Sequence, residues 1–153
     1  MPILSISLRL RCATLVALSG GAVAQTMSLW GGEVSMFLPD FTDMLWAGVL
    51  GAGAAGLLFG DLFGRAERTG VMWAMLGWAI ATLVGAMFGA GAVIAYETNA
   101  PLANMGTSMM EGAPLGVLAL VSGVTGSPIV AAVWVLSGLA VHCATRAERS
   151  APT

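Results

Sequence analysis

Long apolar stretches alternate with short polar segments along this chain. Three stretches are long and apolar enough to cross a bilayer as helices, at about 44–63, about 71–95 and within 115–143. A spanning helix needs about 20 predominantly apolar residues. The pattern therefore predicts an all-α integral membrane protein, in which residues 1–153 form a single domain and a bundle of three or four transmembrane helices.

Residues 1–30 permit two interpretations. A basic start precedes an apolar run over residues 12–18, and small residues of the A-x-A kind precede Gln25. This order is typical of a secretory signal peptide. The same segment also suits a first span, at about 12–30. Both interpretations place residue 30 on the outer side, and we favour the retained span.

The last apolar stretch contains two prolines that affect its expected form. Ser127 followed by Pro128 is a helix start signal, because serine caps a helix and proline suits its first turn. Pro114 similarly suits the start of a short helix that ends near residue 124. The stretch is then either one long helix kinked at Pro128, which we favour, or a half-helix followed by a span from Pro128 to Thr145.

Charge is distributed in register with these stretches. The six positive charges are all arginine, and five of the eight acids lie in segments that lack arginine. Positive residues concentrate on the cytoplasmic side of membrane proteins. The loop at 65–68 and the C-terminus are therefore expected to be cytoplasmic, and residues 97–111 external. The arginine pairs are Arg9 and Arg11, Arg65 and Arg68, and Arg146 and Arg149; the five acids away from them are Glu33, Asp40, Asp43, Glu97 and Glu111.

Composition agrees with a membrane setting. Hydrophobic residues make up 58% of the 153 residues and charged residues 9%, whereas soluble domains carry about 25% charged residues. The net charge of −2 gives no electrostatic support for binding nucleic acid. The absence of lysine beside abundant Ala, Gly and Arg indicates a GC-rich bacterial genome. We therefore expect a multi-pass protein of a bacterial inner membrane.

Small residues recur at every fourth position in the first two clear spans. Residues four apart lie on nearly one face of a helix. A strip without large side chains lets two backbones approach closely, which is how membrane helices associate. The strips are expected to pack on each other, within one chain or between chains. Their members are Gly48, Ala52, Gly56 and Gly60 in the first span, and Gly77, Ala81, Gly85 and Gly89 in the second.

Asp61 is the acid closest to the interior of a span. Acids inside membranes often bind ions or protons. Arg65 follows one helical turn later, however, and both residues lie at the cytoplasmic boundary. This spacing predicts an interfacial ion pair between Asp61 and Arg65.

Methionines on the outer side suggest one metal hypothesis. Met105, Met109 and Met110 could present thioethers to Cu(I), and His142-Cys143 could receive the ion at the inner face. Loop methionines more often fill gaps or contact lipid. A lone histidine such as His142 is also a weak indication of haem. We therefore expect no cofactor, and the sequence shows no catalytic motif.

Two classes of function fit these features. The first is a non-enzymatic subunit or scaffold of a membrane complex, which packs through its Gly/Ala strips against lipid, copies of itself or other subunits. The alternative is a small oligomeric transporter or channel, for copper or another small solute, with a broken helix from Pro114 to Pro128. We favour the first because small-residue strips are abundant and embedded polar groups are scarce.

Overall fold

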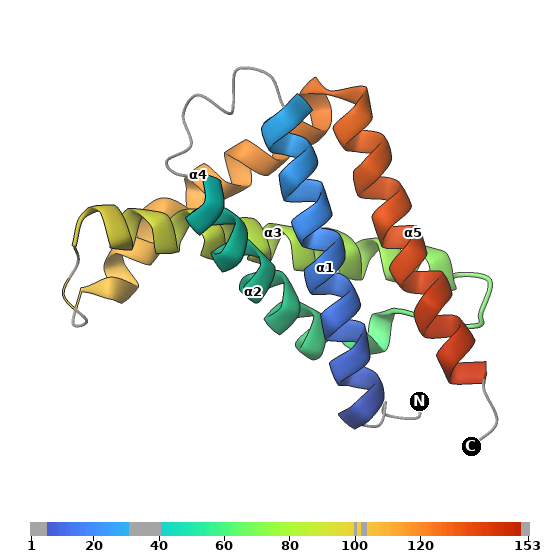
Figure 1. Cartoon of the computed structure of the whole chain (residues 1–153). Helices are drawn as coiled ribbons and strands as arrows, with labels where there is room; N and C mark the ends of the chain where they lie inside the picture. The colour runs from blue at the N-terminus through green and yellow to red at the C-terminus, as the bar shows by residue number, and fades with distance from the viewer. Residues whose placement is uncertain (1–5, 31–40, 100, 102–103, 151–153) are drawn as a thin grey trace.

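The computed structural model describes residues 6–30, 41–99, 101 and 104–150, and this part of the chain is almost entirely helical, with no strand. The segments join into one folded body, in which helices from both halves of the sequence contact each other (Figure 1). The helices are α1 (Ile6–Trp30), α2 (Phe41–Phe59), the short 3-10 helix η2 (Gly60–Leu62), α3 (Gly70–Glu97), α4 (Met105–Gly126) and α5 (Pro128–Ser150).

The helices have the length and composition of transmembrane segments. Among the described residues, α1, α3, α4 and α5 are each long and apolar enough to cross a membrane. Helix α2 has 19 residues, which at 1.5 Å per residue give about 28 Å, close to the hydrocarbon thickness of a bilayer. The expected all-α membrane bundle is confirmed.

The helices pack on one another where small residues lie. Helix α2 packs on α3, and α1 packs on the other side of α2 and beside α5. Helix α3 lies across α1 and α5, and α4 packs on its second half (Figure 1). The largest fully buried side chains are Trp78, Phe63, Val16, Val130 and Val141.

The stretch at 115–143 is not the single kinked helix that we favoured. Helix α4 ends at Gly126, and α5 begins at Pro128. Ser127 between them has extended backbone angles of −130° and 117°, and its hydroxyl accepts a hydrogen bond from the Val130 N–H. The break has a simple cause: the ring of Pro128 disfavours helical geometry at Ser127, and the serine caps the next helix.

The alternative half-helix is also too short. Helix α4 begins at Met105, well before Pro114, which lies inside the helix. Proline leaves the carbonyl of Met110 without its helical hydrogen bond. The segment expected to be external, 97–111, therefore contains the first turns of α4.

The three arginine-bearing segments meet at one end of the molecule, which we call the arginine end. Arg9 of α1 and Arg149 of α5 both reach Asp61 of η2. Helix α4 lies away from this end: it contacts α3 at Gly91 and α1 at Met27, so it joins the far end of α3 to the start of α5 (Figure 1). The chain returns to the arginine end only through α2 and α5.

Candidate functional site

The contact between α2 and α3 is built from small residues. A methyl group on Gly85 would place its carbon 2.9 Å from the main-chain oxygen of Gly48 and 3.1 Å from Cβ of Ala52. Real side chains do not approach a neighbouring backbone so closely, so these two helices touch through their main chains. The strip is used here within one chain.

Gly56 belongs to the same strip but meets a different helix. A methyl carbon on Gly56 would lie 2.9 Å from Cβ of Val16 and 3.0 Å from Cα of Ala13, both in α1. Gly53 faces Ala17 of α1 as well. Helix α2 is therefore held between α1 and α3 by two small-residue faces.

The remaining predicted packing positions are also internal. Ala52 and Ala81 are buried in the core, and a methyl carbon on Gly77 would lie 3.0 Å from Cβ of Leu62. Gly60 is buried in η2, and Gly89 lines a cavity described below.

The closest helix contact was not predicted from the sequence. A methyl group on Gly116 of α4 would overlap the main-chain oxygen of Ala86 in α3, and one on Gly112 would lie 2.7 Å from Cα of Gly91. The signal was present as Gly112-x3-Gly116. The two glycines lie on either side of Pro114, where the sequence predicts the start of a separate short helix.

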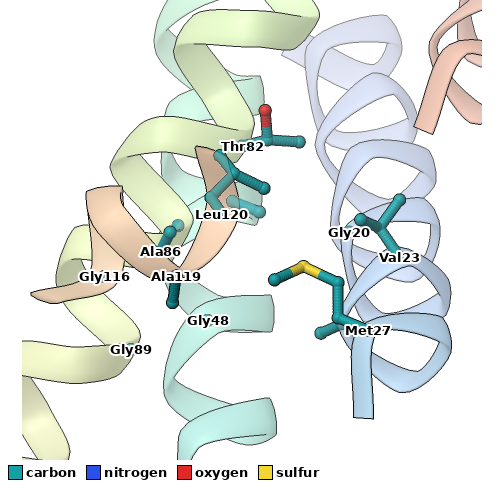
Figure 2. A pocket seen from close by; sticks show the side chains of 13 residues that line it. Gly20, Val23, Met27, Gly48, Thr82, Ala86, Gly89, Gly116, Ala119 and Leu120 are labelled. Atoms are coloured by element: carbon teal, nitrogen blue, oxygen red, sulfur yellow. The ribbon is translucent and has the colours of Figure 1, made fainter. Parts of the chain in front are cut away.

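A small apolar cavity lies between α1, α2, α3 and α4, and Figure 2 shows it with Met27 reaching across from α1 toward Leu120 of α4. Its volume is about 70 Å³. The walls are mostly glycine and alanine, so backbones surround it closely. Its lining residues are Gly20, Val23, Ala24, Met27, Gly48, Ala52, Thr82, Gly85, Ala86, Gly89, Gly116, Ala119 and Leu120.

The one side-chain hydroxyl in this wall, that of Thr82, is fully used by the protein. It donates to the Trp78 carbonyl at 2.9 Å and accepts from the Trp134 indole N–H at 3.1 Å. The Trp78 indole in turn donates to the Trp134 carbonyl at 2.8 Å. Two tryptophans and one threonine thus link α3 to α5 by reciprocal hydrogen bonds.

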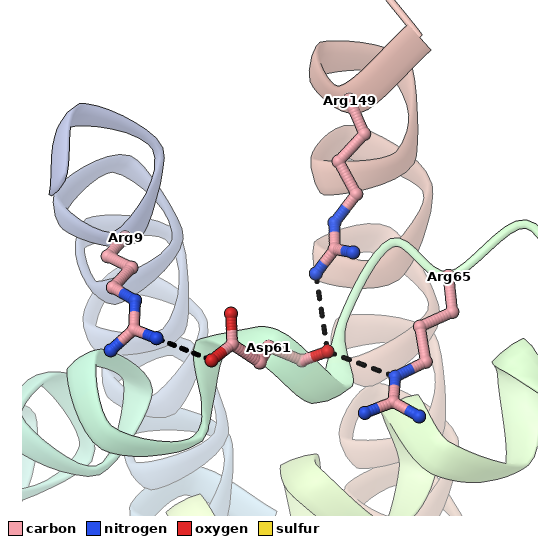
Figure 3. Close-up of polar contacts among 4 residues, drawn as sticks. All are labelled: Arg9, Asp61, Arg65 and Arg149. Carbon is pink, nitrogen blue, oxygen red and sulfur yellow. Dashed lines mark hydrogen bonds and ion pairs between the residues drawn. The ribbon is translucent and has the colours of Figure 1, made fainter. Parts of the chain in front are cut away.

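Polar side chains concentrate at the arginine end, around Asp61 (Figure 3). The Asp61 carboxylate forms an ion pair with Arg9. The Asp61 main-chain oxygen accepts from Arg65 Nε at 3.0 Å and from Arg149 at 3.2 Å. Residues from α1, η2, the following loop and α5 therefore converge on one residue.

The predicted partnership of Asp61 and Arg65 is corrected in its form. The two residues do meet, but Arg65 binds the main-chain oxygen, and among the described ion pairs the carboxylate belongs to Arg9. The spacing rule assumed a continuing α-helix. Here the helix ends in the 3-10 turn of η2 and the chain reverses at Gly64, whose φ of +71° lies in the left-handed region.

Nearby, Arg11 reinforces the arginine end by a longer pair with Glu148, at 3.8 Å. The guanidinium of Arg65 also lies over the ring of Trp73, 5.4 Å from its centroid. Both contacts tie neighbouring segments to the cluster around Asp61.

The copper hypothesis gains no geometric support. His142 is buried, and its Nδ1 accepts a hydrogen bond from the Gly64 N–H at 3.1 Å, while Cys143 is exposed. His142 Nε2 is buried and has no hydrogen-bond partner among the residues that the structure describes. No group of three metal-ligating His, Cys, Asp or Glu side chains occurs within the described residues. The side chain of Met105 lies outside the described part of the structure.

The fold and these contacts define a class, an α-helical multi-pass membrane protein whose helices pack through glycine and alanine. Comparison with known protein families, curated proteins and solved structures finds no match. Function must therefore be argued from the contacts themselves.

Proposed function

We propose that this chain is a small non-enzymatic component of a bacterial inner membrane, a subunit or scaffold of a membrane complex. The main support is that polar side chains between the helices bond to the protein's own backbone and to each other. A scaffold needs a firmly packed body, and the Trp78–Thr82–Trp134 link and the glycine contacts provide one.

The segment proposed for a transport path supports the same conclusion. The Thr125 hydroxyl donates to the Val121 carbonyl at 2.7 Å, and the Ser127 hydroxyl caps α5. Transport of a hydrophilic solute normally needs polar groups that face a path. Here both hydroxyls serve the local backbone.

The structure also changes where association is expected. The predicted strips pack inside the chain, so we propose that partners or further copies contact large apolar side chains on the outer faces of α2 and α4. Leu50 and Leu58 of α2 are 73% exposed, and Met110 of α4 is 77% exposed. Lipid covers these faces wherever no partner does.

Transport assays on the purified protein test this proposal directly. Proteoliposomes that contain only this protein are expected to show no saturable uptake and no conductance for copper or other small ions. In mild detergent, the protein is expected to run as an oligomer or to hold other membrane subunits at fixed stoichiometry.

The Pro114–Pro128 segment provides the matched variant. Thr125→Val combined with Ser127→Ala should leave assembly and flux unchanged. A saturable flux that the double substitution removes would overturn the scaffold proposal and establish the transporter.

A further inference from the structure

The arginines around Asp61 carry more positive charge than the Asp61 carboxylate can neutralise. Arg9, Arg65 and Arg149 all contact Asp61, which offers a single carboxylate. Arg65 and Arg149 donate to the same main-chain oxygen from different directions, so both guanidinium groups lie close to that oxygen. Like charges at such a separation repel each other, and an anion bound against both would remove that repulsion.

The cluster also has donors to offer. Arg65 uses Nε for Asp61 and rests on Trp73, which fixes the plane of its guanidinium. Within the described part of the chain, no hydrogen bond occupies its two terminal nitrogens. Arginine presents its N–H groups as a planar fork that matches the oxygens of a phosphate.

The site is accessible from outside the protein. The side chain of Arg9 is 31% exposed and that of Asp61 38% exposed. Exposed apolar side chains lie beside it on α1: Ile6 is 79% and Leu10 54% exposed. A basic cluster adjoining an apolar helix surface suits a molecule with an anionic head and hydrocarbon chains.

We propose that Arg65 and Arg149, with Arg9, bind the phosphate of an anionic phospholipid whose acyl chains lie against α1. The site lies where three apolar helices end, and Trp73 marks the level that tryptophan prefers at membrane interfaces. Basic pockets between transmembrane helices bind such headgroups. This binding is independent of the scaffold function proposed above.

The test uses the full chain in nanodiscs of equal parts phosphatidylglycerol and phosphatidylcholine, followed by native mass spectrometry of the released protein. Bound lipid is expected to be enriched in phosphatidylglycerol. One arginine near a membrane surface contributes about 1 kcal/mol, or about fivefold in affinity. Arg65→Gln and Arg149→Gln are therefore each expected to lower the enrichment by about fivefold.

Arg68→Gln is the matched control. Arg68 is exposed and lies in the same loop as Arg65, so this substitution removes the same charge from that loop. An Arg68→Gln protein that loses as much enrichment as the other two, or native protein whose bound lipid matches the bilayer composition, would overturn the proposal. If Arg149→Gln does not fold, Arg65→Gln and the native protein still decide it.

A second arm separates the headgroup from free phosphate. Thermal unfolding is measured in detergent with either phosphatidylglycerol or excess inorganic phosphate. The lipid is expected to raise the unfolding temperature and inorganic phosphate to leave it unchanged. Equal stabilisation by both would assign the site to free phosphate and reject the lipid.

Discussion

Individual glycines on α4 have very different surroundings. A methyl group on Gly116 would overlap the backbone of α3, whereas nothing lies within 4 Å of one on Gly106 or Gly126. The same substitution on one helix therefore separates the effect of a helix contact from the effect of helix propensity.

Gly116→Ala is expected to destabilise the protein by about 1–3 kcal/mol, because the added carbon must push α4 away from α3. Gly106→Ala, the control, is expected to be neutral or to stabilise by up to about 1 kcal/mol. Thermal unfolding in detergent measures both. Equal stability of the two variants would show that α4 does not pack on α3 in this way.

The Thr82 hydroxyl is the second group whose contribution to stability can be measured. Thr82→Val keeps the shape of the side chain but leaves the partly buried Trp134 indole N–H without its acceptor. Hydrogen bonds between membrane helices contribute about 0.6 kcal/mol on average and at most about 1.7. The substitution is therefore expected to lower the free energy of unfolding by an amount in this range. Thr125→Val removes an exposed hydroxyl bonded within its own helix and should change the unfolding free energy less.

At the scale of helices, the sequence predicted those helices whose bounds are set by the length of an apolar stretch. The expected spans at 44–63 and 71–95 agree with α2 plus η2 and with α3 to within a few residues. The start of α4 was missed because Thr107, Ser108 and Glu111 make it locally polar, and contact with α3 at Gly91 stabilises it instead. Arg9 could not be assigned to Asp61, since no local pattern connects residues so far apart in the chain.

Helix α1 is expected to remain in the mature protein. Cys12, Val16 and Val23 of α1 are buried in the core, and Gly56 of α2 packs closely against α1. Removing residues 1–24 would expose that surface and remove Arg9 from Asp61. Intact-mass measurement of the purified protein decides the matter, and a mass that corresponds to residues 25–153 would show cleavage.

At the scale of the whole molecule, the arginine end limits the path of the chain. Arg9 begins α1, Asp61 follows α2 and Arg149 ends α5, and all three meet. If α1, α2, α3 and α5 each cross the membrane, α4 must begin and end on the far side. Its length permits a crossing, but a crossing would carry α5 and Arg149 to the side opposite Arg9.

We therefore expect both ends of α4 to be accessible from the outer side and the end of α5 from the cytoplasm. Single cysteines replace Gly106, Gly126 or Ala147 in a protein lacking Cys12 and Cys143; the two glycines have open space for a side chain, and Ala147 is exposed. A membrane-impermeant thiol reagent added to intact cells should label positions 106 and 126, while position 147 should react only after the membrane is opened. Labelling of 147 in intact cells, with 126 protected, would mean that α4 crosses the bilayer and that the arginine end does not lie on one side of it. Arginine concentrates on the cytoplasmic side of membrane proteins, and the ion pair between α1 and η2 holds that arrangement in place.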